Sequence, residues 1–393
     1  MRIGVNCFLL QPHIGGLKQY FLTLFKELLL HDTENEYIFF WFPHNAEELS
    51  KLETERWKDN AILLRDQREM TAYLDRLDLY FCPFGTLYPR PLPLPTVVTL
   101  PDIQEVFYPE FFTVEDRYSY DLHSPSSTRM ADRVVTPSNF SKNTIVKHHR
   151  LADGKVVVIH HSADECYYHC EKFARPVDRP LPDAFVFYPA NFWKHKNHDL
   201  LLQALGLLQR EKNLSIPVVF TGFEQANGYP LSEKVREYGR LAMCHILGYV
   251  ASEEMAYLYS RARILVFPSL FEGFGIPLVE SMAAGCPVVA ADATSIPEVL
   301  GNAGLLFDPA SPRAIADTLE KVWCDASLRQ KLVALGKQRA KSFSAARAAQ
   351  AHLAVFAEAR NAYSYAHFWK RRWIMRPYHR ACVDWRWRGR KGS

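Results

Sequence analysis

Two glutamates stand eight residues apart in the glycine-rich segment Phe271-Glu272-Gly273-Phe274-Gly275-Ile276-Pro277-Leu278-Val279-Glu280. An ionised carboxylate accepts several hydrogen bonds, and its two oxygens suit the paired hydroxyls of a vicinal diol. Gly275 has no Cβ and lets the backbone come close to a ligand. The segment therefore predicts a site for a hydroxyl-rich ligand, with Glu272 in a loop and Glu280 about one turn inside a helix.

The residues on either side of this segment predict the elements that position it. Ala262–Pro268 is a short, apolar and β-branched run, typical of a buried strand. Pro277–Ala284 has the pattern of a helix, with proline in the first turn and Gly285 just past the end. Such a unit of strand, loop and helix directs free backbone N–H groups and the positive end of the helix dipole toward the loop. This arrangement favours a phosphate.

Length and composition narrow the class of protein. A chain of 393 residues exceeds one ordinary core and predicts two domains. The hydrophobic share of 48% and charged share of 23% are those of a soluble globular protein, and a net charge of +4 does not by itself indicate nucleic acid. No apolar run reaches the roughly 18–20 residues that span a bilayer, and Met1–Cys7 lacks a signal-peptide pattern. The eight cysteines form no C-x-x-C pair, so we expect reduced thiols in a cytoplasmic protein.

Strand-like runs alternate with helical patterns along both halves of the chain, which predicts parallel sheets covered by helices. In the first half the expected strands are Arg2–Phe8, Asp78–Cys82, Thr96–Leu100, Arg133–Thr136 and Lys155–Ile159. In the second half they are Ala184–Pro189, Pro217–Thr221, His245–Leu247, Ile264–Phe267 and Pro287–Ala291.

The predicted fold is α/β, with two doubly wound Rossmann-like domains facing a central cleft. We expect an N-terminal domain over residues 1–170, a linker over 171–183, a second domain over 184–350, and a C-terminal crossover helix and tail over 351–393. The linker is assigned from its prolines and charges.

Five segments of the chain resemble the retaining group 1 glycosyltransferases, family 4 of the GT-B fold. These segments are Gly15–Tyr20, Thr136–Ser141, Pro189–His198, Glu272–Glu280 and Ser295–Glu298. The resemblance covers nearly the whole chain to about residue 345. Within the family, Pro189–His198 is similar to the bacterial O-antigen and exopolysaccharide mannosyltransferases. The resemblance implies a GT-B hexosyltransferase with an acceptor-side N-terminal domain and a nucleotide-sugar donor domain after it.

The resemblance implies roles for three charged residues. Glu272 would contact donor sugar hydroxyls close to the reacting carbon, and Glu280 would accept hydrogen bonds from the ribose diol. Lys196 would neutralise the diphosphate as the glycosidic bond breaks. The structural alternatives are a solvated loop glutamate, a glutamate favoured by the helix dipole, and a surface lysine.

Backbone groups from both domains are expected to complete the donor site. Gly15 and Gly16 would bring the first loop of the N-terminal domain close to the phosphates or the sugar, although turns also use glycine pairs. From the second domain, the backbone expected to approach the sugar and diphosphate belongs to Gly273, Phe274, Gly275 and Ile276.

The chain departs from the family pattern at two positions. Many relatives carry an arginine where this chain has Asn191, so one of two expected cations is missing. Either His195 or Lys194 compensates, or Lys196 alone is sufficient. Relatives often carry a histidine where this chain has Pro101. The following Asp102 is retained and is the weaker candidate for a catalytic contact with the sugar or the acceptor. Its alternative is a turn residue after proline.

No metal or other cofactor is expected. A cluster of histidines and cysteines near residue 165 matches no zinc spacing, and no D-x-D motif lies in a site-forming place, which argues against a metal-dependent GT-A enzyme. No G-x-G-x-x-G follows the first strand, which argues against a nicotinamide dehydrogenase. A nucleotide-sugar epimerase on the same fold lacks specific support.

These observations predict a retaining enzyme that moves a hexose from a nucleoside-diphosphate sugar to a lipid-linked or oligosaccharide acceptor in bacterial surface-polysaccharide synthesis. The resemblance favours GDP-mannose over UDP-hexoses as the donor. It also implies front-face attack, in which the departing phosphate accepts the proton of the acceptor hydroxyl. The alternative, favoured by Pro101 and Asn191, is a catalytically silent nucleotide-sugar-binding subunit of a glycosyltransferase complex.

The C-terminal tail differs from the rest of the chain. From Arg360 to Ser393 it holds ten Lys or Arg residues and a single acidic residue, Asp384, together with four tryptophans. One interpretation is a crossover helix that packs on the first domain. The other is attachment of residues 369–391 to an anionic membrane surface, with a peripheral location on the inner face of the plasma membrane. We expect a mixture of the two, with a helix to about residue 375 followed by a basic surface arm. The alternative is a disordered tail with no partner. No nucleic-acid partner is expected.

Overall fold

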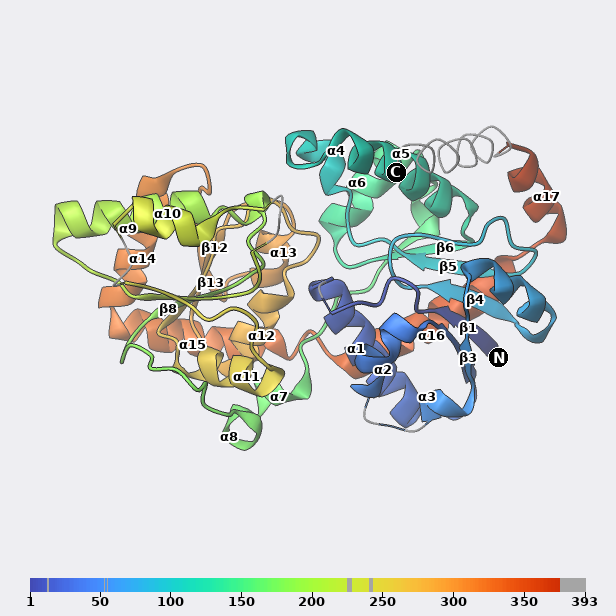
Figure 1. Ribbon diagram of the computed structural model, residues 1–393, viewed down its shortest axis with the longest axis horizontal. Coiled ribbons are helices and arrows are strands. Elements are labelled where there is room, and N and C mark those ends of the chain that lie inside the picture. The colour runs from blue at the N-terminus through green and yellow to red at the C-terminus, as the bar shows by residue number, and fades with distance from the viewer. Residues whose placement is uncertain (13, 53, 55, 225–227, 240–242, 375–393) are drawn as a thin grey trace. The chain divides into compact units, whose positions relative to one another are not determined.

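The structure, a computed structural model, describes residues 1–12, 14–52, 54, 56–224, 228–239 and 243–374. The chain divides into two compact units (Figure 1), the first made of residues 1–160 with 345–393 and the second of residues 161–344. Each unit contains a parallel sheet with helices packed on it. This confirms the prediction of two doubly wound α/β domains.

The sheet of the first unit has seven parallel strands in the order β3-β2-β1-β4-β5-β6-β7. Its centre is the pair β1 and β4, with Val5 beside Phe39 of β2 on one side and Phe81 of β4 on the other. These strands are buried on both faces, so their sequences are apolar runs that do not alternate between polar and apolar residues. The strands are β1 (Arg2–Asn6), β2 (Glu36–Trp41), β3 (Ala61–Leu63), β4 (Leu79–Cys82), β5 (Thr96–Thr99), β6 (Arg133–Thr136) and β7 (Val156–Val158).

The helices of the first unit come from both ends of the chain. The C-terminal helix α16 packs on α1, where the hydroxyl of Tyr20 lies 2.8 Å from Nε2 of His352. Phe356 of the same helix packs edge-on against Phe81 of the central strand, with ring centroids 5.1 Å apart. The helices are α1 (Gly16–His31), α2 (Ala46–Ser50), α3 (Arg56–Asp59), α4 (Gln104–Phe107), α5 (Val114–Met130), α6 (Asn139–His149), α16 (Ala345–Ala362) and α17 (Tyr365–Ile374).

The sheet of the second unit has six parallel strands in the order β10-β9-β8-β11-β12-β13. They are β8 (Val186–Pro189), β9 (Val218–Thr221), β10 (Cys244–Ile246), β11 (Ile264–Phe267), β12 (Val288–Ala291) and β13 (Gly304–Phe307). The helices are α7 (Glu165–Tyr168), α8 (Cys170–Phe173), α9 (His198–Lys212), α10 (Leu231–Glu237), α11 (Ser252–Arg261), α12 (Ile276–Ala284), α13 (Ile296–Leu300), α14 (Pro312–Cys324) and α15 (Ala326–Ala340).

In each sheet, the direction in which successive strands are added reverses at one pair of neighbouring strands. The position of this pair determines where ligands bind. In the first unit the reversal falls between β1 and β4, and in the second between β8 and β11. The loops that leave such neighbouring strands diverge to opposite faces of the sheet and open a crevice at the carboxyl ends of the strands. The two reversal points are therefore the places where each unit is built to hold a ligand.

The boundary between the units differs from the expected one. The first unit ends at residue 160 rather than 170, because α7 and α8 pack against α11 of the second unit. The expected linker over 171–183 also belongs to the second unit. Its backbone N–H at Arg175 donates to the carbonyl of Glu253 at 3.0 Å, and the guanidinium of Arg179 donates to the carbonyl of Leu247 at 3.1 Å. The C-terminal boundary falls at 344 rather than 350.

Other expectations fall partly outside the described residues. One of them is the expected basic surface arm after about residue 375, which lies outside those residues. The seven cysteines in the described ranges form no disulfide bond. None of the helices that the structure describes combines the length and the apolar character needed to cross a bilayer.

Candidate active site

An ion pair joins the loops that follow β8 and β11, the strands at the reversal point of the second unit. The Nζ atom of Lys196 lies 2.6 Å from Oε1 of Glu272. Both side chains are largely buried, with exposed fractions of 17% for the lysine and 12% for the glutamate. Lys196 also lies over the ring of Phe267, 5.8 Å from its centroid. The structure therefore brings together two of the three expected catalytic residues.

The backbone that carries Lys196 is fixed by hydrogen bonds to strand ends. Lys196 ends a short 3₁₀ helix, η5 (Lys194–Lys196), and its carbonyl accepts from the hydroxyl of Tyr188 at 2.6 Å. The carbonyl of His195 accepts from the backbone N–H of Leu270 at 2.8 Å. These contacts tie the β8 loop to the β11 loop, so the lysine is held in place before any ligand binds.

Asn197 completes this support and was not singled out from the sequence. It adopts a left-handed conformation with φ of 60° and is 5% exposed. Its amide Nδ2 donates to the carbonyls of Pro268 and Pro309, at 3.1 and 2.8 Å. Asparagine tolerates this backbone conformation better than most residues. The signal in the sequence was only an asparagine before a helix, which does not reveal partners about 70 and 110 residues away.

The loop that carries Glu272 is held from the segment after β12. The backbone N–H of Glu272 donates to Oγ1 of Thr294 at 3.1 Å, and the hydroxyl of Ser295 donates to the carbonyl of Glu272 at 2.8 Å. Ser295 opens the stretch that the sequence singled out as typical of the family. Its hydrogen bond holds the loop of Glu272 in position.

Helix α12 begins directly after this loop, as predicted from Pro277 and Gly285. Gly275 is the residue before the helix and has φ of 93°, a conformation that L side chains rarely adopt. A Cβ there would lie 3.0 Å from Cδ1 of Leu278. Gly285 ends the helix with φ of 76°. Within the first turn, Pro277 has no N–H, and the N–H of Leu278 donates to the carbonyl of Gly275 at 2.9 Å.

The side chains of the other expected loop contacts point into the protein interior. Phe274 is 3% exposed and packs edge-on against His161 and Phe343, with ring centroids 5.3 and 5.6 Å away. Ile276 is also buried. A ligand contact from Gly273, Phe274 or Ile276 would therefore be made by the backbone.

Glu280 is buried in the second unit, on α12. It is 6% exposed, and its Oε2 accepts a hydrogen bond of 2.7 Å from the hydroxyl of Tyr259 on α11. Burial raises the pKa of Glu280 to about 7, and the nearby charge of Asp164 adds to the rise, while the hydrogen bond from Tyr259 opposes it. Glu280 is therefore expected to convert between its neutral and ionised forms near neutral pH.

Asn191 braces the loops of the site, and His195 does not supply the missing positive charge. Oδ1 of Asn191 accepts from the backbone N–H of Phe223 at 3.0 Å, so the amide braces the loops after β8 and β9. Burial, together with the charges of Lys196 and His198, lowers the pKa of His195 well below its ordinary value. The imidazole is therefore neutral at pH 7, and Lys194 is exposed. Lys196 carries the positive charge at this point of the described chain.

The remaining expected site residues lie in the first unit. Gly15 caps the start of α1 with φ of 57°, and Gly16 is the first residue of that helix. The loop before them is held by Lys18, whose Nζ donates to the carbonyl of Pro12 at 2.9 Å and lies 3.6 Å from the buried carboxylate of Glu48. This brace was not predicted from the sequence.

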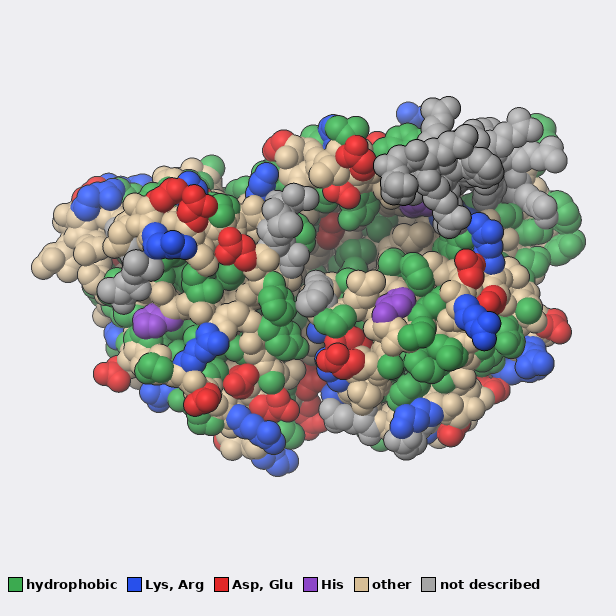
Figure 2. Space-filling model, viewed as in Figure 1, with side chains coloured by type: hydrophobic (Ala, Val, Ile, Leu, Met, Phe, Trp, Pro, Cys, Tyr) green, Lys and Arg blue, Asp and Glu red, His purple; other side chains and the backbone are tan. Residues whose placement is uncertain are grey.

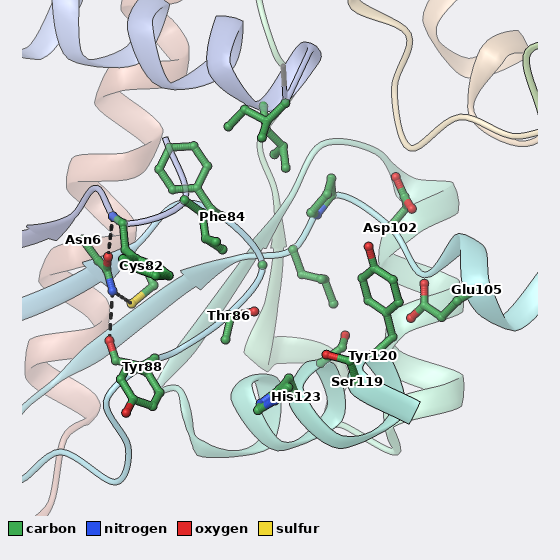
Figure 3. A pocket seen from close by; sticks show the side chains of 18 of the residues that line it. Asn6, Cys82, Phe84, Thr86, Tyr88, Asp102, Glu105, Ser119, Tyr120 and His123 are labelled. Carbon is green, nitrogen blue, oxygen red and sulfur yellow. Dashed lines mark hydrogen bonds between the residues drawn. The ribbon is translucent and has the colours of Figure 1, made fainter. Parts of the chain in front are cut away.

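Asp102 follows β5 and has a local structural role as well. Its Oδ1 accepts from the backbone N–H of Gln104 at 3.2 Å, which is the turn geometry expected of an aspartate after proline. Asp102 also lines a cavity of about 610 Å³ at the carboxyl ends of the first unit's strands (Figure 3).

The charged side chains elsewhere form no patch of one sign on the face shown in Figure 2, where acidic and basic side chains are interspersed over each unit. Within the described ranges, no group of three or more His, Cys, Asp or Glu residues is arranged to hold a metal ion. The candidate site is therefore defined by the Lys196–Glu272 pair and the start of α12.

Comparisons with known proteins show the family to which this chain belongs. Residues 171–339 match the family described as Glycosyl transferases group 1. The O-antigen chain mannosyltransferase B of Escherichia coli is 32% identical over 294 residues, which cover 72% of this chain and 75% of the relative.

Solved structures share the fold at lower sequence identity. A glycosyltransferase of Rickettsia africae superposes with a TM-score of 0.69 at 16% identity, over 91% of this chain and 98% of the other. HepE of Anabaena, solved in complex with UDP-glucose, gives a TM-score of 0.69 at 16% identity, over 91% of this chain and all of the other (100%).

Proposed function

The chain belongs to the group 1 glycosyltransferases of the GT-B fold, and on this premise we propose that it is a retaining mannosyltransferase of bacterial O-antigen synthesis. The proposed donor is GDP-mannose and the proposed acceptor is a lipid-linked or oligosaccharide glycan. The observation that carries the proposal is the Lys196–Glu272 pair at the reversal point of the second sheet, directly before α12. The similarity to an O-antigen chain mannosyltransferase supports the choice of sugar and pathway.

In the proposed donor complex, Lys196 faces the diphosphate, and the positive end of the α12 dipole faces the same phosphates. The ammonium exchanges its carboxylate partner for phosphate oxygens. Glu272 is then free to accept hydrogen bonds from sugar hydroxyls. A donor that bridges both groups replaces one charge contact by two sets of charge-assisted hydrogen bonds.

The proposed reaction breaks the bond between the anomeric carbon and the phosphate oxygen, and forms a bond from the acceptor oxygen to the same carbon on the same face. The acceptor hydroxyl proton passes to the departing phosphate oxygen. Positive charge develops at the anomeric carbon and negative charge on the diphosphate. Lys196 and the helix start stabilise the second of these charges.

Glu280 is the proposed partner of the ribose diol. Its carboxylate already accepts from Tyr259, and it has capacity for further donors. To bind the ribose hydroxyls in place of its buried protein contacts, Glu280 must be ionised, because a protonated carboxyl accepts fewer hydrogen bonds. Nucleotide binding and the charge of Glu280 are therefore coupled in this proposal.

The alternative is a silent nucleotide-sugar-binding subunit. The observation that favours it is the loss of one expected cation, because Asn191 is engaged in bracing a loop and His195 is neutral. A single experiment separates the two. Purified protein is incubated with GDP-mannose and UDP-glucose, and release of GDP or UDP is followed with and without polysaccharide-precursor extract. Mannose transfer with retained anomeric configuration, assigned by NMR, supports the enzyme. Nucleotide binding without any release from either donor supports the silent subunit.

We also propose contact with the inner face of the plasma membrane through α17. Tyr365, Trp369 and Trp373 stand four residues apart and share one face of this helix, with exposed fractions of 58%, 48% and 73%. Phe368 on the same helix is buried and anchors it to the first unit. Exposed tryptophan in a segment whose sequence is rich in Lys and Arg suits an anionic bilayer surface.

A further inference from the structure

Tyr259 lies in the core of the second unit, although its side chain ends in a hydroxyl group. It is on α11 and has an exposed fraction of 0%. A buried hydroxyl needs a hydrogen-bond partner, because it has lost its contact with water. The partner of Tyr259 is the carboxyl of Glu280 on α12, whose Oε2 accepts the bond at 2.7 Å. A core position that phenylalanine would fill equally well therefore directs a donor at the proposed ribose contact.

The ring of Tyr259 is fixed by edge-on contacts with two other aromatic rings. The ring centroid of Tyr167 on α7 lies 5.5 Å away at an interplanar angle of 88°, and that of Phe187 on β8 lies 5.1 Å away at 79°. Both of these side chains are buried as well. Close packing from two separate elements prevents the ring from turning, so the core sets the direction of the hydroxyl before any ligand binds.

The bond from Tyr259 determines which way the carboxyl group of Glu280 faces. A carboxylate has two oxygens and about four positions that accept hydrogen bonds. Because Tyr259 engages Oε2, the second oxygen is left for another donor. A rotation of the carboxyl group would break the existing bond. The second oxygen therefore keeps one direction, which is the condition for receiving a vicinal diol.

The same hydrogen bond favours the ionised form of Glu280. Burial raises the pKa of this carboxyl to about 7, and the bond from Tyr259 acts in the opposite direction. Without this bond the pKa would be higher still, because the buried charge would lose a donor that stabilises it. Tyr167 acts in the same sense as Tyr259, and the charge of Asp164 acts in the opposite sense.

The thiol and phenol groups around Glu280 keep one protonation state near neutral pH. Burial raises the pKa of Cys166 on α7 and of Cys286 above the ordinary value of a thiol. Burial and the charge of Glu280 raise the pKa of Tyr167 and Tyr259 well above the ordinary value of a phenol. All four groups therefore remain neutral between pH 6 and pH 9, and the two tyrosines remain hydrogen-bond donors.

The other elements packed on α12 are strands β11 and β12 and helices α13 and α15. The two strands carry only apolar side chains. On α15, Lys337 lies beside Gly285 at the end of α12, and the guanidinium of Arg339 donates to the carbonyl of Glu298 on α13 at 2.7 Å. The pKa of Glu280 responds to groups on α11 and around α7.

We propose that Tyr259 is a positioning residue for the nucleotide: its hydroxyl holds one carboxylate oxygen of Glu280, so that the other oxygen receives the two hydroxyls of the ribose. This role rests on the proposed function, in which Glu280 binds the ribose diol. When the ribose binds, Tyr259 keeps its bond to Oε2, and the second oxygen exchanges its buried contacts for the ribose hydroxyls. The hydroxyl of Tyr259 also favours the charge that Glu280 needs for this contact.

Tyr259→Phe tests this role, because it removes the hydroxyl and keeps the packed ring. The full chain is titrated by calorimetry at pH 7 and pH 9 with GDP or UDP, whichever the wild type binds more tightly. Loss of one hydrogen bond to a charged carboxylate is expected to raise the pKa of Glu280 by about one unit. The variant should then bind the nucleotide about fivefold more weakly than the wild type at pH 7 and within about twofold of it at pH 9, where Glu280 is ionised in both proteins.

Two controls show whether the effect passes through the carboxyl and the ribose. Tyr257→Phe removes a hydroxyl from the same helix and is expected to bind the nucleotide as the wild type does. The 2′,3′-dideoxy form of the nucleotide has no diol and should bind the wild type and Tyr259→Phe equally at pH 7. An equal loss for both nucleotides, a loss as large at pH 9 as at pH 7, or an equal effect of Tyr257→Phe indicates a structural role and overturns the proposal.

The protein without nucleotide gives a second readout. In the wild type the contribution of Glu280 to stability is lost as the pH rises to about 7, and in Tyr259→Phe this loss should extend about one pH unit higher. Melting temperatures between pH 5 and pH 9 measure it, and an unmoved pH dependence overturns the role of Tyr259 even where the wild type transfers mannose. If the wild type neither binds GDP or UDP nor transfers a sugar, the proposed function fails, and the ribose role of Tyr259 fails with it.

Discussion

The ammonium of Lys196 and the carboxylate of Glu272 lie 2.6 Å apart, although 76 residues separate them in the chain. Each group is assigned to an opposite part of the same donor, the lysine to the phosphates and the glutamate to the sugar. The pair keeps both charges compensated when no donor is present. It also places them within the span of one sugar phosphate.

Replacing Lys196 tests the role of the charge. Lys196→Ala is expected to lower the rate of donor cleavage by about 10²–10³, the loss typical of removing one group that stabilises transition-state charge. The measurement is the release of nucleotide from the donor at saturating concentration. Lys194→Ala is the matched control, because this neighbouring lysine of η5 is exposed. An effect of equal size in both variants, or one confined to acceptor affinity, contradicts the assignment.

Replacing Glu272 tests whether the pair acts as a unit. Glu272→Ala is expected to abolish transfer while the circular dichroism spectrum stays that of the wild type. The double variant Lys196→Ala/Glu272→Ala should be less destabilised than the sum of the single variants, because each single change leaves one partly buried charge without its partner. We expect a coupling of about 1 kcal/mol in urea unfolding. If the double variant loses as much stability as the two single variants combined, the Lys196–Glu272 contact contributes nothing to folding stability. Near-normal turnover in Glu272→Ala would show that Glu272 has no catalytic role.

The raised pKa of Glu280 predicts how stability depends on pH. A carboxyl whose pKa is near 7 in the folded state and near 4.5 in the unfolded state keeps its proton better when folded. Its contribution to stability is therefore full below about pH 4.5 and is lost as the pH rises to about 7. Glu280→Gln should flatten the fall in melting temperature between pH 5 and pH 8.

The same group predicts a pH dependence of nucleotide binding. If the ionised form of Glu280 holds the ribose, the affinity for the nucleotide should rise as the pH passes through about 7. Titration calorimetry at pH 6 and pH 8 measures this change. An affinity that is equal at both pH values, or a Glu280→Gln variant with wild-type affinity, would separate Glu280 from the ribose.

The aromatic face of α17 predicts binding to anionic lipid. Replacing Tyr365, Trp369 and Trp373 together by alanine should weaken sedimentation with phosphatidylglycerol vesicles at least tenfold and leave weak binding to phosphatidylcholine unchanged. Leu30→Ala is the control, because Leu30 is 70% exposed on α1 of the same unit. Vesicle binding by the triple variant that matches the wild type excludes this face as the contact. Loss of vesicle binding at raised salt would identify the basic residues as partners of the tryptophans.

The elements whose ends carry a proline or a glycine could be predicted from the sequence. Helix α12 begins within one residue of its predicted start, because Pro277 suits a first turn and Gly285 adopts the left-handed conformation that ends a helix. Strand β11 is the predicted apolar run after Ala262. By contrast, helix α5 was not predicted, because it contains Pro125 and many serines and has no apolar stripe.

The contacts of the site could be predicted only as far as residue types allow. The sequence indicated that Lys196 and Glu272 serve one ligand, through family resemblance, but not that they pair with each other. The supports from Asn197 and Ser295 depend on strands distant in the chain, which no local pattern reveals.

The first unit is built from both ends of the chain, and this determines when it can be finished during synthesis. The ribosome releases the seven strands of its sheet first, but the helix that covers β4 and bonds to Tyr20 follows only after all of residues 161–344. A nascent chain therefore carries an incomplete first unit, with part of its apolar surface uncovered, while the second unit is already whole. Nonsense mutations shortly after codon 344 should leave the second unit folded and the first unit prone to aggregation.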